Sequence, residues 1–204
     1  MQNFCYNTPC SAGVAHPVER HLAKVEVASS SLVTRSIKPL LSQTEEVFFF
    51  GKEMQMLQFS LLNKQDKMRW LPELFDLLYE NMCDVAPSDL SRECEKALWL
   101  EQVSPALDKA PRQILLCFAD RELAGYLQHY IRGDVLMVEE LQLKRKFHST
   151  FVFYRFVKHF LPMIPGEVAW VEAYADKRNR LSQKLMTRLG MQLIAQGDSP
   201  FVHF

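Results

Sequence analysis

The sequence predicts an α+β domain with a mixed, mostly antiparallel β-sheet flanked by helices. Over residues 56–204, segments with helical spacing of apolar residues alternate with short apolar runs, in the order β-α-α-β-β-β-α-β-α-β-β. One of these helices joins two strands, and such a crossover places the two strands side by side and parallel. Tight polar turns separate other neighbouring strands, which favours antiparallel pairing.

The first elements are a strand and two helices. A short apolar run at Leu57–Leu62 predicts the strand, and apolar residues then recur at helical spacing over Met68–Met82. The second helix is predicted to begin at Ser88 or Asp89, either of which can cap it. We expect it to stop before Pro105, because a proline inside a helix removes a backbone hydrogen bond.

Most of the predicted sheet follows these helices. Gln113–Ala119 and Leu123–Ile131 flank a tight polar turn and predict a hairpin, and Val135–Leu143 predicts a third strand after a second turn. An apolar helix at Ser149–Leu161 then leads to a strand at Val168–Ala175. The strands on either side of this helix are the predicted parallel pair.

The last part of the chain predicts one more helix and two short strands. The helix covers Asn179–Leu189, and Gly190 follows it at the position where glycine often ends a helix. Met191–Ala195 and Phe201–Phe204 are the predicted strands.

Composition excludes several classes of partner. The chain has 204 residues, with 24 basic and 24 acidic side chains, and this balance argues against a general nucleic-acid binder. No apolar run approaches the roughly 20 residues of a membrane-spanning helix. The five cysteines form no CxxC pair and no Cys/His metal spacing. We therefore expect a cytoplasmic monomer or homodimer with no metal, nucleic-acid or membrane partner.

Residues 1–55 do not read as part of the domain, because they show neither a helical nor a strand period. They can be interpreted as a disordered leader. Alternatively, Ala12–Ser36 resembles an in-frame translation of a glycine tRNA gene: codons can be chosen whose nucleotides pair as all four arms of the tRNA, with GCC as the anticodon. Gly51–Glu53 can likewise encode a ribosome-binding sequence shortly before Met56. On this hypothesis translation begins at Met56, and residues 1–55 are an over-extended start.

A motif near the end of the chain suggests a family. Residues 179–191 read NRLSQKLMTRLGM, and a small-Gly pair occurs in Ala124–Leu127 after a polar turn. Together with the element order, residues 56–204 resemble the GCN5-related N-acetyltransferase (GNAT) superfamily, whose pattern at the motif is Asn-x-x-Ala-x-x-Leu-Tyr-x-x-Leu-Gly-Phe. The matching residues are Asn179, Leu185, Leu189 and Gly190, with Ser182 and Met191 as similar replacements.

The resemblance implies where acetyl-CoA would bind. In this superfamily the pantetheine arm enters between two splayed parallel strands, and the pyrophosphate lies at the next helix N-terminus, where free N–H groups favour anions. Family members have glycines in the loop before that helix, whereas residues 134–165 contain none, so side chains would have to compensate. The implied cofactor-binding residues are Leu141, Gln142, Leu143, Lys144, Arg145, Lys146, His148, Ser149, Thr150 and Asn179.

The resemblance also implies catalytic roles. Glu139 and Glu140 are the candidates for the general base that deprotonates the amine, and strand alternation would put them on opposite faces unless a bulge intervenes. Met186 stands where many members have the tyrosine that protonates the leaving thiolate, so Tyr174 on the neighbouring strand is the candidate acid.

The function implied is acetyl-CoA-dependent N-acetyltransfer, by direct transfer to an amine of a small molecule or a protein. The alternative is a degenerate member of the same fold that works as a CoA-binding or protein-interaction module without catalysis. The glycine-free loop and Met186 favour the alternative, and the two glutamates and the basic loop favour the enzyme.

Overall fold

The computed structural model describes residues 56–109, 111–148, 150–194 and 200–204. The predictions for residues 1–55, including the tRNA-like segment, fall outside these ranges. Ser149 and Ala195 also lie outside them.

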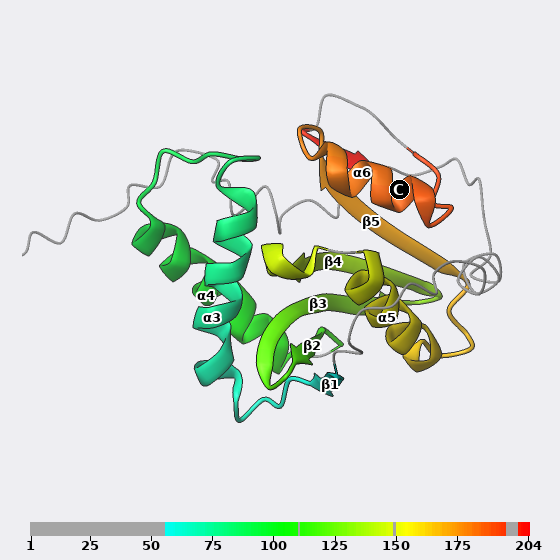
Figure 1. Cartoon of the computed structure of the whole chain (residues 1–204), viewed down its shortest axis with the longest axis horizontal. Helices are drawn as coiled ribbons and strands as arrows, with labels where there is room; N and C mark the ends of the chain where they lie inside the picture. Colours follow the sequence, from blue (N-terminus) through cyan, green and yellow to red (C-terminus); the bar gives the residue numbers. More distant parts are fainter. Residues whose placement is uncertain (1–55, 110, 149, 195–199) are drawn as a thin grey trace, which may run out of the picture.

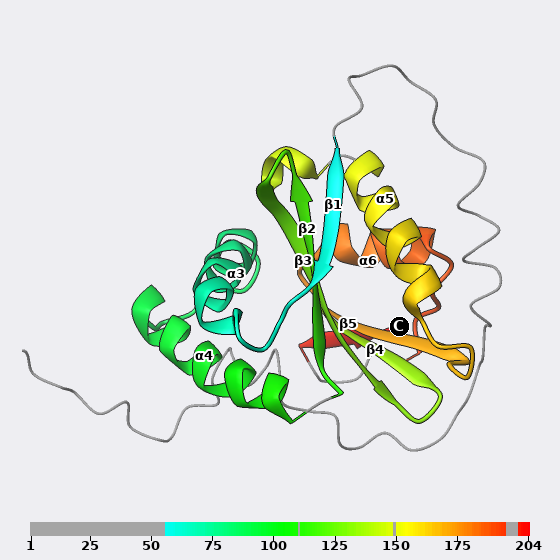
Figure 2. The ribbon, with the colours of Figure 1, turned by 90° about the horizontal axis from the view of Figure 1, so that it is seen from below.

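The fold is built on a six-stranded mixed sheet whose spatial order follows the sequence (Figures 1 and 2). Within the part of the chain that the structure describes, only β4 and β5 pair in parallel, and every other neighbouring pair is antiparallel. The predicted fold class and parallel pair are therefore confirmed. The strands are β1 (Leu57–Leu61), β2 (Gln113–Ala119), β3 (Glu122–Arg132), β4 (Val135–Leu143), β5 (Trp170–Asp176) and β6 (Phe201–His203).

Helices cover both faces of the sheet, as Figure 2 shows. One pair packs on one face and the other pair lies on the opposite face. The pairs are α3 (Lys67–Met82) with α4 (Arg92–Asp108), and α5 (Thr150–Phe160) with α6 (Arg180–Arg188). The short turns η1 (Arg145–Phe147) and η2 (Leu161–Met163) flank α5. None of these helices within the described ranges has the length and apolarity needed to cross a membrane.

Two apolar clusters hold the layers together, one on each face of the sheet. Trp99 and Tyr126 lie in the cluster under α3 and α4, whereas Leu127 and Phe156 lie in the cluster under α5. Neighbouring residues of β3 thus point to opposite faces, as the two-residue period of a strand requires. From Tyr126 onward this alternation puts even-numbered side chains of β3 beneath α3 and α4, whereas before a bulge in the β2–β3 pair the faces are reversed, with Leu123 on the α3/α4 side and Ala124 on the other.

The predicted start of α4 is wrong by a few residues. The N-cap is Ser91, whose hydroxyl accepts a hydrogen bond from the Cys94 backbone N–H at 3.2 Å. Neither Ser88 nor Asp89 caps the helix, and the Ser88 hydroxyl instead accepts from the backbone of Leu90. Several serine and aspartate residues in a row compete for this role, and sequence alone does not rank them.

The predicted end of α4 is also wrong, because the helix continues through Pro105 to Asp108. Val103 and Leu107 lie one turn apart on its inner face and are buried in the apolar cluster with Trp99. Burying these side chains offsets the single backbone hydrogen bond that the proline cannot donate. Tertiary packing therefore overrides the local signal to stop.

Residues 191–194 do not form the strand predicted for Met191–Ala195. The segment makes a backbone contact with the last strand, where the Ile194 N–H donates to the His203 carbonyl at 2.8 Å. Leu193 and Ile194 remain exposed, so their apolar side chains do not anchor the segment to the sheet. The predicted strand at the C-terminus is confirmed as β6.

The hairpin between β2 and β3 contains local backbone strain. Asp120 and Arg121 both adopt positive φ, at 50° and 69°, in a two-residue turn that glycine favours. We expect Arg121→Gly to raise the free energy of unfolding by about 0.5–1 kcal/mol, because relief of strain exceeds the added chain entropy of glycine. Urea unfolding would measure this. Arg121→Ala is the control, and an equal gain in stability in that variant would show that relief of strain at the positive φ is not the cause.

Candidate active site

The central feature of the molecule is the divergence of β4 from β5. The two strands pair only between Val135–Val138 and Trp170–Ala173, and beyond this segment they separate (Figure 1). A cavity of about 260 Å³ lies at this point. Its wall is mostly apolar and comes from the sheet, α3, α5 and α6. The edge of β4 from Glu139 to Leu143 that faces β5 is therefore not used in pairing with it.

Helix α6 forms one side of the cavity without burying any of its residues. Leu185 and Met186 line the cavity, and Met186 also packs against a small third apolar cluster, which consists of Ala175, Val202 and Phe204. Asn179 caps the helix: its side-chain oxygen accepts from the Ser182 N–H at 3.0 Å, and both residues line the cavity. The α6 N-terminus thus lies at the cavity.

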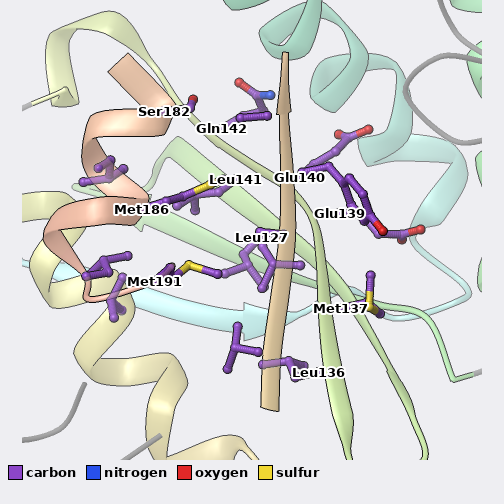
Figure 3. A pocket seen from close by; sticks show the side chains of 18 of the residues that line it. Leu127, Leu136, Met137, Glu139, Glu140, Leu141, Gln142, Ser182, Met186 and Met191 are labelled. Carbon is purple, nitrogen blue, oxygen red and sulfur yellow. The ribbon is translucent and has the colours of Figure 1, made fainter. Parts of the chain in front are cut away.

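A β-bulge at Glu139 determines where the two candidate bases point. Gln128 of β3 pairs with Glu140, but the next residue, His129, pairs with Val138, so Glu139 is the extra residue. An extra residue reverses the alternation of the strand. Glu139 and Glu140 consequently both project to the α3/α4 face (Figure 3), where Glu139 contacts Gln128 and Glu140 contacts Tyr126.

Glu140 is a buried carboxyl with two hydrogen-bond donors. The Tyr126 hydroxyl donates to Oε2, and the Trp99 indole N–H donates to Oε1 at 3.3 Å. Burial raises the pKa of this carboxyl from 4.5 to about 7, although the hydrogen bonds from Tyr126 and Trp99 oppose the rise. A carboxyl with a pKa near neutrality can both accept and release a proton under physiological conditions.

Glu139 is instead held by an ion pair. The Arg112 guanidinium donates to both of its carboxylate oxygens, and Gln128 Nε2 donates to Oε2 at 3.0 Å. This bidentate pairing fixes the side chain and balances its charge. The two adjacent glutamates therefore have different surroundings, one buried with neutral donors and one paired with a cation.

Tyr174 is the first residue of β5 past the paired segment, and it lines the cavity. Its ring stacks on His203 with 4.3 Å between centroids, and His203 Nε2 lies 3.2 Å from a carboxylate oxygen of Glu172. Burial and the negative charge of Glu172 raise the pKa of Tyr174. The phenol is therefore protonated at neutral pH.

The end of β4 is tied to α3 and to the following loop. Asn81 donates to the Gln142 side chain at 3.0 Å and to the Leu143 carbonyl at 2.9 Å. A ring nitrogen of His148 lies 2.7 Å from the same carbonyl. Leu141 points the other way, toward α6 (Figure 3).

The basic loop after β4 is engaged by acidic groups of the protein itself. Lys144 and Lys146 both form ion pairs with Glu122, which begins β3, and these pairs lower the pKa of Glu122. Arg145 donates to the Glu80 carbonyl at 2.8 Å and lies 3.4 Å from Asp84. Phe147 is buried and anchors the loop in the core. Thr150 begins α5, whereas Ser149 lies outside the described residues.

The sequence did not identify the partners of the two glutamates. Tyr126, Trp99 and Arg112 are distant from them along the chain, so no local motif connects them. Alternation could have placed Tyr126 and Gln128 on one face of β3, but the neighbouring positions on β4 depend on the bulge. Burial raises the pKa of the Cys117 thiol to about 12.

The mostly antiparallel sheet with one splayed parallel pair is a fold that this chain shares with solved acetyltransferases. Among solved structures, the chain is similar to the PaiA N-acetyltransferase from Thermoplasma acidophilum in complex with coenzyme A, with 14% identity, a TM-score of 0.57, and coverage of 72% of this chain and 97% of the other. An acetyltransferase from Thermus thermophilus gives 15% identity, a TM-score of 0.58, and coverage of 74% and 97%.

A third similar structure is an aminoglycoside N-acetyltransferase in complex with CoA, with 14% identity, a TM-score of 0.52, and coverage of 72% of this chain and 95% of the other. No protein-family model matches the sequence, and no curated protein matches it. These likenesses establish the fold, and the function has to be argued from the site.

Proposed function

We propose that this protein is an acetyl-CoA-dependent N-acetyltransferase that transfers the acetyl group directly to an amine of a small molecule or a protein. The observation that carries the proposal is the cavity at the splayed β4–β5 pair, with Glu140 on its wall and the pKa of that carboxyl raised to about 7. Similar folds solved with coenzyme A support it.

The residues at the splay suit the pantetheine arm of acetyl-CoA. The edge of β4 from Glu139 to Leu143 does not pair with β5, so an extended ligand can add to it as a strand would. Leu141 and Met186 supply apolar contacts on the α6 side. The phosphates would draw on Lys144 and Lys146, which would then exchange Glu122 for the ligand.

Glu140 is the proposed general base. Its carboxylate accepts a proton from the substrate ammonium, and the resulting amine attacks the thioester carbon, forming the C–N bond. When the C–S bond breaks, the sulfur takes a proton from the Tyr174 hydroxyl, and Tyr174 regains one from the nitrogen. The products are the amide and free coenzyme A, and Glu140 releases its proton to solvent. Acetyl-CoA supplies the activated thioester.

Glu139 is proposed as a positioning residue. Its pairing with Arg112 and Gln128 fixes the bulge that turns Glu140 to the α3/α4 face. Removing the charge of Glu139 would leave the Arg112 guanidinium without this carboxylate and loosen the bulge. Its role is thus to hold the base in place, whereas Glu140 exchanges the proton.

A second function is favoured by the loop that follows β4. Residues 134–165 contain no glycine, and Lys144 and Lys146 are already paired with Glu122. A loop in this state would contact phosphates poorly, which suits a protein-interaction module that has lost catalysis. Isothermal titration calorimetry with acetyl-CoA, followed by a screen of amine acceptors, separates the two functions. Binding with acetyl transfer supports the enzyme, whereas no detectable heat of binding supports the module.

Replacing Glu122 should strengthen the binding of acetyl-CoA. Glu122→Gln removes the acidic competitor for Lys144 and Lys146, so we expect the dissociation constant to fall by up to about five-fold at low salt. Calorimetry at two salt concentrations measures this, and the gain should shrink as salt increases. Glu101→Gln, on the exposed surface of α4, is the charge-matched control. An equal gain in that variant would mean that only net charge matters.

A further inference from the structure

A second cavity, of about 110 Å³, lies between α3, α4 and the loop that joins them. Phe75, Tyr79 and Trp99 supply much of its wall. Leu78 and Met82 line both this cavity and the larger one at the splayed strands, so the two spaces are adjacent.

Trp99 connects the second cavity to the proposed base. Its ring forms part of the cavity wall, and its indole N–H donates to Glu140 at 3.3 Å. The second cavity therefore lies on the far side of Trp99, Leu78 and Met82 from Glu140.

The charges around the larger cavity do not suit a polycation. Glu139 is paired with Arg112, Asp176 is paired with Arg178, and Glu140 is held by neutral donors. Among the residues that line the second cavity, Glu95 is the single carboxylate. The rest of that lining is mostly apolar or aromatic, and the cavity has roughly the size of one aromatic ring.

We propose that the acceptor is a primary monoamine with an apolar substituent about the size of an aromatic ring. The amine lies at Glu140, and the substituent passes between Leu78 and Met82 to fill the second cavity against Phe75 and Trp99. This inference rests on the proposed acetyl transfer for its kinetic test, but the binding of the substituent can be measured without turnover.

The test compares 2-phenylethylamine, ethylamine and spermine as acceptors for the full chain. We expect kcat/KM for 2-phenylethylamine to exceed that for ethylamine by about 30-fold, because the ring is removed from water. Ala86 lines the second cavity, so Ala86→Leu fills it and should reduce this ratio at least about five-fold. Ala97→Leu, on the exposed side of α4, is the matched control and should leave the ratio unchanged.

Binding of 2-phenylethylamine, followed by tryptophan fluorescence, separates the two proposals. Binding at the second cavity is supported if the binding is saturable and if Ala86→Leu weakens it but Ala97→Leu does not. This holds even if no acetyl transfer occurs. In that case only the proposed function fails. A preference for spermine, or equal responses of the two alanine variants, would overturn the inference.

Discussion

Glu140→Gln should lower kcat/KM for acetyl transfer by about 10²–10³-fold, because glutamine cannot accept the proton of the substrate ammonium. In the wild-type protein, activity should rise with pH as Glu140 ionises and level off above pH 7, since burial raises the pKa of this carboxyl to about 7. The variant should lose that part of the pH–rate profile. Equal turnover of the variant and the wild type would remove Glu140 from the mechanism.

The same substitution should change how stability depends on pH. Between pH 4.5 and about 7, the folded protein holds a proton on Glu140 that the unfolded chain has released, so wild-type stability falls as pH rises. Each pH unit of this interval corresponds to roughly 1.4 kcal/mol, or about 3 kcal/mol in all. The free energy of unfolding of Glu140→Gln, relative to wild type, should therefore increase by about that amount from pH 4.5 to above pH 7.

The variant has to be compared with the wild type because His129 also titrates over part of this pH range. Burial lowers the pKa of His129 from 6.5 to about 4, so between these values the unfolded chain binds the extra proton and stability rises with pH. The two groups oppose each other over much of the same range, and the wild-type curve alone would conceal both. Because His129 is present in both proteins, urea unfolding at several pH values isolates Glu140. A difference that does not vary with pH would show that the pKa of Glu140 is not raised.

Two kinds of feature could not be predicted from the sequence: the register between strands, and contacts between residues that are far apart along the chain. The parallel β4–β5 pair could be predicted because a single helix joins the two strands, and the crossover rule needs no further information. The face on which Glu140 lies could not be predicted, because the bulge at Glu139 depends on how β3 and β4 align. The basic loop was recognisable locally, but its partner Glu122 begins another strand.

Gly125 has no room for a side chain, because strand β4 lies directly against it. It lies opposite Leu143 in the β3–β4 pair, and an added Cβ would stand 2.2 Å from the Gln142 carbonyl oxygen and 2.4 Å from Leu143 Cδ2. The nearest of these atoms belongs to the backbone of β4, so the strand itself would have to move. Gly125→Ala should therefore lower the free energy of unfolding by about 3 kcal/mol.

The strain from this alanine falls on the part of β4 that borders the proposed cofactor site. If the variant folds, displacement of Gln142 and Leu143 should weaken acetyl-CoA binding as well as stability, because that strand edge is where the pantetheine arm would pair. Gly166→Ala is the control, since a Cβ there meets nothing within 4 Å. Urea unfolding and calorimetry on both variants test this. Full stability in Gly125→Ala would show that β4 does not approach β3 this closely, whereas reduced stability with unchanged binding would place the cofactor away from this strand end.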